Sequence, residues 1–514
     1  MSRSLLGAVL PLLFLLCLGA PLPVAGQAPE STTALTGEAL PVVEETLENG
    51  MRILVLARPA PPTVSFVVRY GVGSVNERLG NTGIAHLLEH LLFKGTTTIG
   101  TRNVKAERAL FSRMDALQDS ILREAGRRTP RPDSARIRVL RDSIRVLEDS
   151  ARSFVVSNEF DEILSRNGSR NLNAMTTEEA TTYYVQLPAN RAKLWFVLEG
   201  DRMTNPVFRE FYAERDVVAE ERRSRVDTNP AGRMYETHMA SAFRVHPYGV
   251  PVIGHMSDIE QLTRPQVRAY YERYYGARNA VVAVVGAVEP DSILAWGHRY
   301  LGRAPRGEDP PAVLAREPAQ RGERRTEVVF DARPHLKIGW KVRDVFHEDT
   351  PALLILSSLL TGGRTSRLHR RMVQEERVAT FISSSIGPGD LHPGLFTVDA
   401  YPRAPHEPAE LEAIVYEELE RLAETPPDLP ELQRVRNQLE ASRIRRLKSN
   451  FGLAFQLAAS ASLFDDWAAT FRYTRRLQEV TPEDVRRVAR RYFRPEDRTV
   501  TVLVTEERGP EERP

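Results

Sequence analysis

Leu262–Val285 read LTRPQVRAYYERYYGARNAVVAVV, and Val480–Val504 read VTPEDVRRVARRYFRPEDRTVTVLV. Each stretch begins with a threonine that can cap a helix, continues through a helical segment and a turn, and ends in a β-branched run typical of a buried strand. The two capping threonines, Thr263 and Thr481, lie 218 residues apart, and several residues that follow them match at the same offset. A pattern that recurs at a constant offset indicates an internal duplication. We therefore expect an α+β protein with two homologous α/β-sandwich domains.

The segment between the two repeats predicts a domain boundary. Residues 303–325 read RAPRGEDPPAVLAREPAQRGERR, and this density of proline and arginine is typical of a linker. The chain has 514 residues, which is enough for more than one hydrophobic core. We expect an N-terminal domain over residues 40–302 and a C-terminal domain over residues 326–508.

A different pattern interrupts the N-terminal domain between residues 104 and 157. Apolar residues recur there at steps of three and four on both sides of RRTPRPD, residues 127–133, which is a turn signal. The other faces of both segments are charged. The pattern predicts an antiparallel helical hairpin, inserted at 104–157 as a structural arm without which the core can close. The alternative is a dedicated partner-binding device.

The beginning of the chain differs from the rest in composition. Residues 4–22 read SLLGAVLPLLFLLCLGAPL, follow Arg3 and precede small residues. This order predicts a secretory signal peptide, 1–26 or 1–28, with an N-terminal membrane anchor as the alternative. We expect secretion across the inner membrane of a bacterium into the periplasm, and no membrane span in the mature chain. Since Cys17 is the only cysteine, the mature chain would have neither a disulfide nor a thiolate metal site.

The charge balance restricts the class of partner. The chain has 70 basic and 68 acidic residues, a net charge of +2. Nucleic-acid-binding proteins usually show a large basic excess. The sequence therefore predicts no nucleic-acid partner.

One short segment concentrates metal-binding side chains. Gly83–Gly95 read GIAHLLEHLLFKG, with His86, Glu89 and His90 among leucines. Residues four apart share one face of a helix, so the two imidazoles can bind one cation. Two histidines with an acidic side chain suit tetrahedral zinc with an open coordination position. The order His-x-x-Glu-His is the inverzincin pattern.

A third metal ligand is expected in Ala213–Val226, which read AERDVVAEERRSRV. Glu214 and Glu221 are seven residues apart, close to two helical turns, so they share a face with two valines between them. Glu220 points away from that face. We assign Glu221 as a ligand and Glu214 as the group that orients the site. The alternative is that all three glutamates are solvated charges on a surface helix.

Four motifs in one order give the sequence a resemblance to the pitrilysin-type zinc peptidases, a family that includes mitochondrial processing peptidase, insulin-degrading enzyme and bacterial two-domain members. The resemblance covers about residue 40 to 505. It implies that His86, His90 and Glu221 bind Zn²⁺, that Glu89 is the general base, and that Asn173 and Ala174 lie on a strand that binds substrate as an added β-strand. The motifs are HLLEH at 86–90, NAMT at 173–176, ERDVVAEE at 214–221 and HPYGVPVIG at 246–254.

The sequence also departs from the family pattern. The spacing from His90 to Glu221 is longer than the resemblance implies, and the expected hairpin accounts for the excess. The second half has no His-x-x-Glu-His, so we expect a non-catalytic copy. Leu360–Leu368, LTGGRTSRL, is a reduced version of a glycine-rich substrate loop, and Tyr401 is only a candidate for an Arg/Tyr pair that grips substrate.

These features predict a zinc-dependent endopeptidase that hydrolyses peptides or unfolded protein segments, as a homodimer or a heterodimer with a related subunit. Two alternatives stay open. The chain is an active zinc subunit that needs a separate substrate-gripping partner chain, or it is a non-catalytic peptide-binding scaffold with the same fold.

Overall fold

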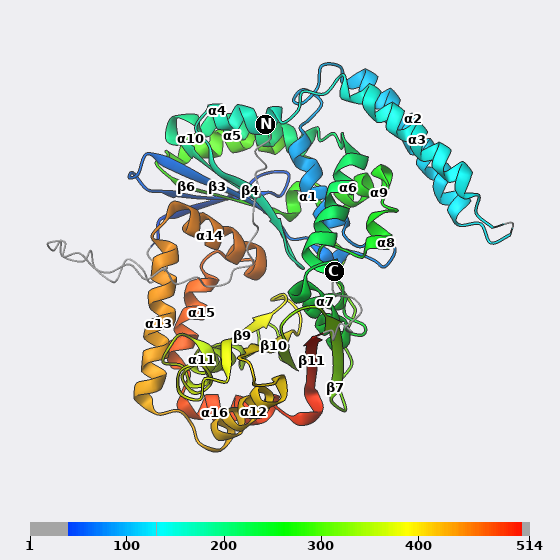
Figure 1. Cartoon of the computed structure of the whole chain (residues 1–514). Coiled ribbons are helices and arrows are strands. Elements are labelled where there is room, and N and C mark those ends of the chain that lie inside the picture. Colours follow the sequence, from blue (N-terminus) through cyan, green and yellow to red (C-terminus); the bar gives the residue numbers. More distant parts are fainter. Residues whose placement is uncertain (1–39, 130, 506–514) are drawn as a thin grey trace.

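A computed structural model of the chain describes residues 40–129 and 131–505 (Figure 1). The expected signal peptide, 1–26 or 1–28, and its alternative, a membrane anchor, lie outside these residues. Across the described ranges, no helix combines the length and the hydrophobicity needed to cross a bilayer.

The N-terminal domain is built on a six-stranded sheet with the order β1-β2-β6-β3-β5-β4. β2 and β6 are parallel, and the other neighbours are antiparallel. The β1–β2 hairpin turns at Asn49-Gly50, where Gly50 has a φ of +88°, a conformation that an Asn-Gly turn favours. β4 is an edge strand. The strands are β1 Val42–Thr46, β2 Arg52–Ala57, β3 Thr63–Tyr70, β4 Arg170–Thr176, β5 Thr181–Pro188 and β6 Ala280–Gly286.

Helices cover one face and one end of this sheet. α4, α5 and α10 lie over the outer face, whereas α1, α6 and α9 gather beyond the end of β4 (Figure 1). Their apolar sides form one continuous core with the sheet. The bounds are α1 Ile84–Leu91, α4 Glu159–Arg166, α5 Ala192–Thr204, α6 Phe211–Arg222, α8 Met256–Ile259, α9 Arg264–Tyr274 and α10 Pro290–Tyr300.

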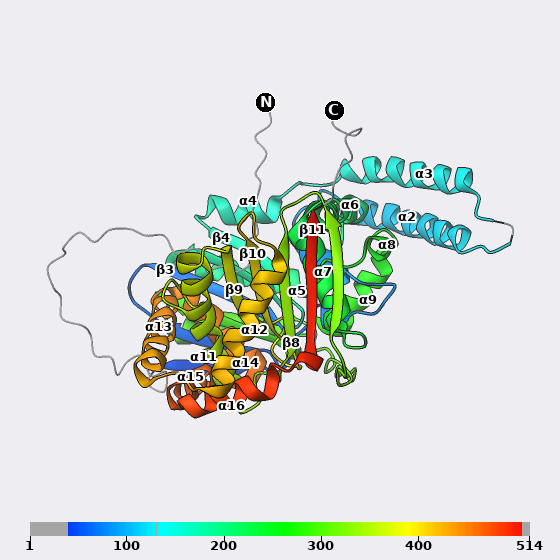
Figure 2. The ribbon, with the colours of Figure 1, turned by 60° about the horizontal axis from the view of Figure 1, so that its bottom comes forward.

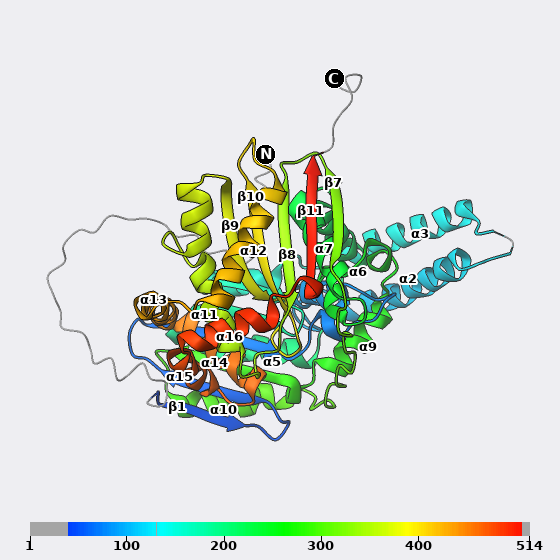
Figure 3. The ribbon, with the colours of Figure 1, turned by 90° about the horizontal axis from the view of Figure 1, so that it is seen from below.

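The C-terminal domain has a five-stranded sheet with the order β7-β11-β8-β10-β9, in which β7 and β11 are parallel. α11, α12 and α16 pack on one face and form the second core (Figure 3). The strands are β7 Arg324–Phe330, β8 His335–Lys341, β9 Ala379–Gly387, β10 Leu395–Pro402 and β11 Arg498–Thr505. The helices are α11 Thr350–Thr361, α12 Pro408–Glu424, α13 Leu429–Leu447, α15 Ala469–Glu479 and α16 Pro482–Tyr492.

The structure contains the duplication that the sequence predicts. Thr263 caps α9 in a capping box with Gln266, and Thr481 caps α16 in a capping box with Asp484. A short 3-10 turn follows each helix, and then an interior strand of the sheet, β6 or β11. The expectation of an α+β fold with two homologous α/β-sandwich domains is confirmed.

Each half of the chain places one helix on the sheet of the other half. α7, Pro230–Ala242, packs on β7 and β11 of the C-terminal sheet. α14, Asn450–Phe464, packs on β3 and β6 of the N-terminal sheet, where Leu453 and Leu457 join its apolar face. Figure 1 shows both helices between the two sheets. This reciprocal helix exchange joins the two halves through apolar contacts.

Two antiparallel helices, α2 Val104–Ala125 and α3 Ser134–Arg152, form a helical arm. The arm extends away from both domains in all three views (Figures 1–3). Its base belongs to the N-terminal core, since Phe111 and Met114 are buried there. Glu107, at the start of α2, forms a fully buried ion pair with Arg209.

Candidate metal centre

Helix α1 starts at a glycine whose backbone is held by a glutamate. Gly83 has a φ of +85°, a left-handed conformation that favours glycine. The Glu77 carboxylate accepts hydrogen bonds from the N–H groups of Gly83 and Ala85, both at 2.8 Å, at the positive end of the helix dipole. The leucines of α1 are buried in the core, so His86 and His90 lie on the side that contacts α6.

Three side chains from α1 and α6 converge on one point. His86 Nε2 lies 3.7 Å from Glu221 Oε2, and His90 Nε2 lies 3.5 Å from the same oxygen. One ligand atom from each residue lies within 4.8 Å of the other two. Donor atoms at about 2.1 Å from a tetrahedral zinc ion are about 3.4 Å from one another. The donor set and its spacing therefore fit zinc, with a fourth coordination position left for water or substrate.

The surroundings set the charges of these groups. Burial and the neighbouring His90 lower the pKa of His86 to about 4, so its imidazole is neutral. Burial opposes ionisation of Glu221, but His90, His86 and Arg225 outweigh it and lower the pKa of Glu221 to about 2. Burial also disfavours the charged form of His90, but Glu214 and Glu221 raise the pKa of His90 to about 9. A bound metal would therefore displace a proton from His90.

Glu214 lies behind His90 on the same face of α6 as Glu221. Its Oε2 is 3.4 Å from His90 Nδ1, the ring nitrogen that does not face Glu221. Its other oxygen is 2.6 Å from Lys94 Nζ, which is also 3.4 Å from Glu210. A carboxylate on the second nitrogen of a ligand histidine fixes the orientation and tautomer of the ring.

Glu89 points to β4 rather than into the group of three ligand atoms. The Thr176 hydroxyl, at the end of β4, donates a hydrogen bond of 2.5 Å to Glu89 Oε2. Burial raises the pKa of Glu89, and this effect exceeds the opposing influence of Thr176 and His90. Glu89 is therefore a more basic carboxylate than an exposed glutamate, next to the open side of the site.

Asn173 and Ala174 lie on β4, which contacts α1 and pairs with β5 on one side only within the described residues. Ala174 is buried, whereas Asn173 is exposed and its side chain accepts a hydrogen bond from Ala174 N–H at 2.9 Å. A free strand edge can bind an extended peptide through backbone hydrogen bonds. The edge runs toward the metal ligands.

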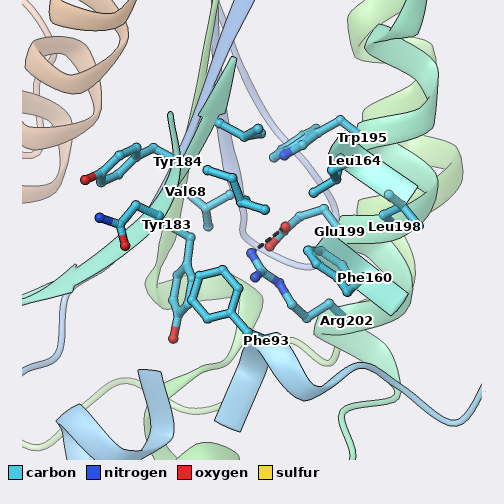
Figure 4. A pocket seen from close by; sticks show the side chains of 13 residues that line it. Val68, Phe93, Phe160, Leu164, Tyr183, Tyr184, Trp195, Leu198, Glu199 and Arg202 are labelled. Atoms are coloured by element: carbon cyan, nitrogen blue, oxygen red, sulfur yellow. Dashed lines mark hydrogen bonds and ion pairs between the residues drawn. The ribbon is translucent and has the colours of Figure 1, made fainter. Parts of the chain in front are cut away.

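A buried charge pair supports β4 and β5 from the side of α5 (Figure 4). Arg202 Nη2 donates to Glu199 Oε2 at 2.6 Å. The guanidinium lies 4.6 Å from the ring centre of Tyr183 and 5.1 Å from that of Phe160. These side chains line a small cavity and connect the sheet behind β4 to two outer helices.

The turn after β4 contacts the C-terminal domain. The buried Glu179 carboxylate accepts hydrogen bonds from the N–H groups of Asp390 and Leu391, at 2.8 and 2.9 Å, in the loop between β9 and β10. It also accepts one from the Tyr248 hydroxyl. Glu179 lies three residues after Thr176, the residue that holds Glu89. The strand beside the metal site is therefore tied at its end to the second half of the chain.

The sequence match to known families follows the two halves of the structure. The family profile described as Insulinase (Peptidase family M16) matches residues 52–110 and 153–255, and the profile described as Peptidase M16 inactive domain matches residues 261–439. The chain belongs to peptidase family M16. The match to the first M16 profile leaves out residues 111–152, which form most of the helical arm.

Curated M16 relatives cover most of the chain. The zinc protease PqqE of Helicobacter pylori is 29% identical over 467 residues, which cover 89% of this chain and 91% of that protein. The probable mitochondrial-processing peptidase subunit beta of Arabidopsis thaliana is 23% identical, over 89% of this chain and 77% of that protein.

Solved M16 structures share the fold. A protease from Helicobacter pylori has a TM-score of 0.74 at 26% identity, over 90% of this chain and 99% of that chain. The periplasmic protease PqqL of Escherichia coli has a TM-score of 0.66 at 17% identity, over 90% of this chain and 47% of that chain. The second likeness concerns the fold alone.

The structure brings His86, His90 and Glu221 together, places Glu214 against His90, and places Glu89 beside them. Sequence reasoning missed four residues that support the site, which are Lys94, Thr176, Glu179 and Arg225. Lys94 lies in the Gly83–Gly95 segment and Thr176 ends the NAMT motif, so both lie close in sequence to residues that the sequence does predict for the site. The other candidates lie in the C-terminal domain: Leu360–Leu368 starts in the last turn of α11 and continues beyond it, and Tyr401 on β10 stacks on His335 at 4.0 Å between ring centres.

Proposed function

We propose that the chain is a zinc-dependent endopeptidase, with the metal held by His86, His90 and Glu221. The observation that carries the proposal is the spacing of 3.5 to 3.7 Å between the imidazole nitrogens and the carboxylate oxygen, which fits one tetrahedral ion. In this proposal residues 40–302 contain the active site, with the hairpin insertion at 104–157. Residues 303–325 are a linker, and residues 326–508 are a non-catalytic copy.

Each side chain of the site has its own role in the proposed reaction. Zinc bound here would lower the pKa of its water toward about 7 and polarise the peptide carbonyl. Glu89 accepts the proton of the attacking water and returns it to the leaving amine, while Thr176 holds the Glu89 carboxylate in place. Glu214, charged and paired with Lys94, keeps His90 oriented. Asn173 and Ala174, on the edge strand β4, align an extended substrate.

This mode of binding selects substrates by conformation more than by sequence. Backbone hydrogen bonds to a strand edge require an extended chain, so peptides and unfolded segments fit and folded proteins do not. The Arabidopsis relative is described as one subunit of a processing peptidase, which favours a second form of the proposal. In that form this chain is the active zinc subunit of a homodimer or heterodimer, and the partner helps to grip substrate. We further propose that residues 1–26 or 1–28 direct the chain to the periplasm.

Metal content and peptide cleavage on one purified preparation test the proposal. The mature chain should contain about one zinc per chain and cleave unfolded peptides, alone or after addition of a partner. His86→Ala and His90→Ala should lose both properties. Glu220→Gln is the matched control, because the Glu220 side chain is 68% exposed on the same helix. Full zinc content in both histidine variants would show that the site is assigned wrongly.

A further inference from the structure

The outer end of the helical arm is strongly basic. Residues 123–139 contain six arginines and two acidic residues, a formal charge of +4 in a chain whose total is +2. The remainder of the chain therefore has a net charge of −2. The arginines are Arg123, Arg127, Arg128, Arg131, Arg136 and Arg138, and all six are exposed.

Both acidic residues of this segment, Glu124 and Asp133, form their contacts within the arm. Glu124 is 3% exposed and accepts a hydrogen bond from Asp133 N–H at 3.1 Å. Arg127 and Arg136 lie 3.2 and 3.5 Å from its two oxygens. The Asp133 side chain caps α3 by accepting two backbone N–H groups. Glu124 therefore offsets charge at two of the six arginines, and Asp133 is held by the backbone of α3.

The outer surface combines unpaired charge with an apolar side chain. Within the described residues, Arg128, Arg131 and Arg138 have no carboxylate within ion-pair distance. Val139, next to Arg138, is 64% exposed. Arginine presents a planar fork of donors that matches phosphate oxygens. Exposed apolar residues among cationic ones are typical of surfaces that bind at the headgroup region of a bilayer.

The arm holds this end away from the two domains. All three views show it projecting from the N-terminal domain (Figures 1–3). α2 has 22 residues and is therefore about 33 Å long. Its base is fixed, because Arg264 donates to the Phe111 carbonyl at 3.2 Å and to Asp115 at 2.8 Å. The tip can therefore contact a flat surface while the metal centre stays clear of it.

We propose that the tip of the helical arm binds a membrane surface rich in anionic phospholipid headgroups. A projecting tip with an exposed valine fits such a surface better than it fits nucleic acid, which is usually bound along a groove or an extended basic face. Each basic residue near an anionic bilayer adds to the affinity, and several together give a salt-sensitive attachment. The secretion expected from residues 4–22 would place the chain beside a membrane. The proposal concerns attachment and does not depend on peptidase activity.

Vesicle co-sedimentation of the mature chain tests this. Vesicles of phosphatidylcholine with phosphatidylglycerol should bind the protein at low salt, and vesicles of phosphatidylcholine alone should not. The triple variant Arg128→Glu, Arg131→Glu, Arg138→Glu should lower the affinity at least about a hundredfold. The matched control, Lys193→Glu, Arg303→Glu, Arg490→Glu, makes the same charge change at exposed positions outside the arm and should bind normally.

A further variant separates membrane binding from general polyanion binding. Val139→Asn should weaken binding to the anionic vesicles several-fold and leave any binding to a DNA duplex unchanged, because only a bilayer accommodates the valine side chain. Circular dichroism and zinc content should match wild type in every variant. Equal loss of vesicle binding in the tip and control triples would overturn the proposal. Tighter binding to DNA than to the vesicles would also overturn it, in favour of a nucleic-acid partner.

Discussion

Glu89 and Glu221 lie at the same centre but should respond differently to the same substitution. Glu89→Gln keeps the three ligands and removes the group that accepts a proton, so zinc content should be unchanged and kcat should fall at least about a hundredfold. Glu221→Gln removes the charged ligand, so zinc itself should be lost first. Metal analysis and peptide kinetics on the same samples measure both effects. An active Glu89→Gln enzyme would exclude Glu89 as the base.

Glu214 should affect the metal through His90 rather than directly. Glu214→Gln weakens the contact at His90 Nδ1, which lies 3.4 Å away, and should reduce zinc affinity about 10- to 100-fold in a chelator competition. At saturating zinc, kcat should recover most of its value. Glu210→Gln is the control, because Glu210 also pairs with Lys94 but does not contact a histidine. Equal zinc affinities in the two variants would contradict the orienting role.

The residues of the site differ in how far the sequence predicts them. His86, Glu89 and His90 follow from helical spacing within one segment, and Glu221 and Glu214 follow from a two-turn repeat on a second helix. Periodicity identifies a face but not the element opposite that face. Thr176 acts through a contact that exists only when β4 meets α1, so its role could not be read from local pattern. Arg225 pairs with Glu221 at 2.7 Å across four residues, a contact that helical spacing alone could have indicated.

Helix α2 provides a buried partner for Arg209, which precedes α6. Arg209 is 1% exposed, pairs with Glu107 at 3.2 Å and donates to the carbonyls of Lys94, Thr96 and Ile99. Glu107→Ala would leave a buried guanidinium without its counter-charge. We expect a loss of about 3–5 kcal/mol in the free energy of unfolding, measured by urea titration. Zinc content should also fall, because Arg209 lies just before α6, the helix that carries Glu221.

The same contacts restrict how the arm can be removed. The expectation that the core closes without residues 104–157 conflicts with the burial of Glu107, Phe111 and Met114 at the arm base. Replacement of residues 119–141 alone by a short Gly/Ser linker serves as the control and should leave unfolding and zinc content close to wild type. A destabilisation as large as that of Glu107→Ala would show that the outer arm also belongs to the core.

The sequence pattern predicts where helices and strands form better than it predicts which sheet each helix packs on. The capped helices and following strands at Thr263 and Thr481 form as expected, because caps and β-branched runs are local signals. The exchange of α7 and α14 was not predicted. A helical pattern shows that an apolar face must be covered, but it does not say which of two similar sheets lies against it.

The stability of the folded chain should depend on pH through Glu178, the neighbour of Glu179 in the chain. Burial raises the pKa of Glu178 from 4.5 to about 7, and the charges of Glu179 and Asp390 act in the same direction. Between about pH 4.5 and 7 the folded chain therefore holds a proton that the unfolded chain has lost. Stability from this group is present at low pH and falls as pH rises through about 7.

Calorimetry from pH 5 to pH 8 measures this dependence. Glu178→Gln removes the titration and should be more stable than wild type at pH 8 by about 1–3 kcal/mol, with little difference at pH 5. Glu220→Gln, an exposed control, should keep the wild-type slope. An identical pH slope in Glu178→Gln and wild type would show that Glu178 does not titrate in this range.

The reciprocal exchange of α7 and α14 makes the chain resemble two subunits that share one polypeptide. A cut within residues 303–325 would leave both exchanged helices on their host sheets, so the nicked protein should keep its shape. Either half made alone would lack the helix that covers its sheet, and for the N-terminal half this exposes Leu54, Val67 and their neighbours to water. Two genes could therefore encode this protein as well as one, provided that both products are made together.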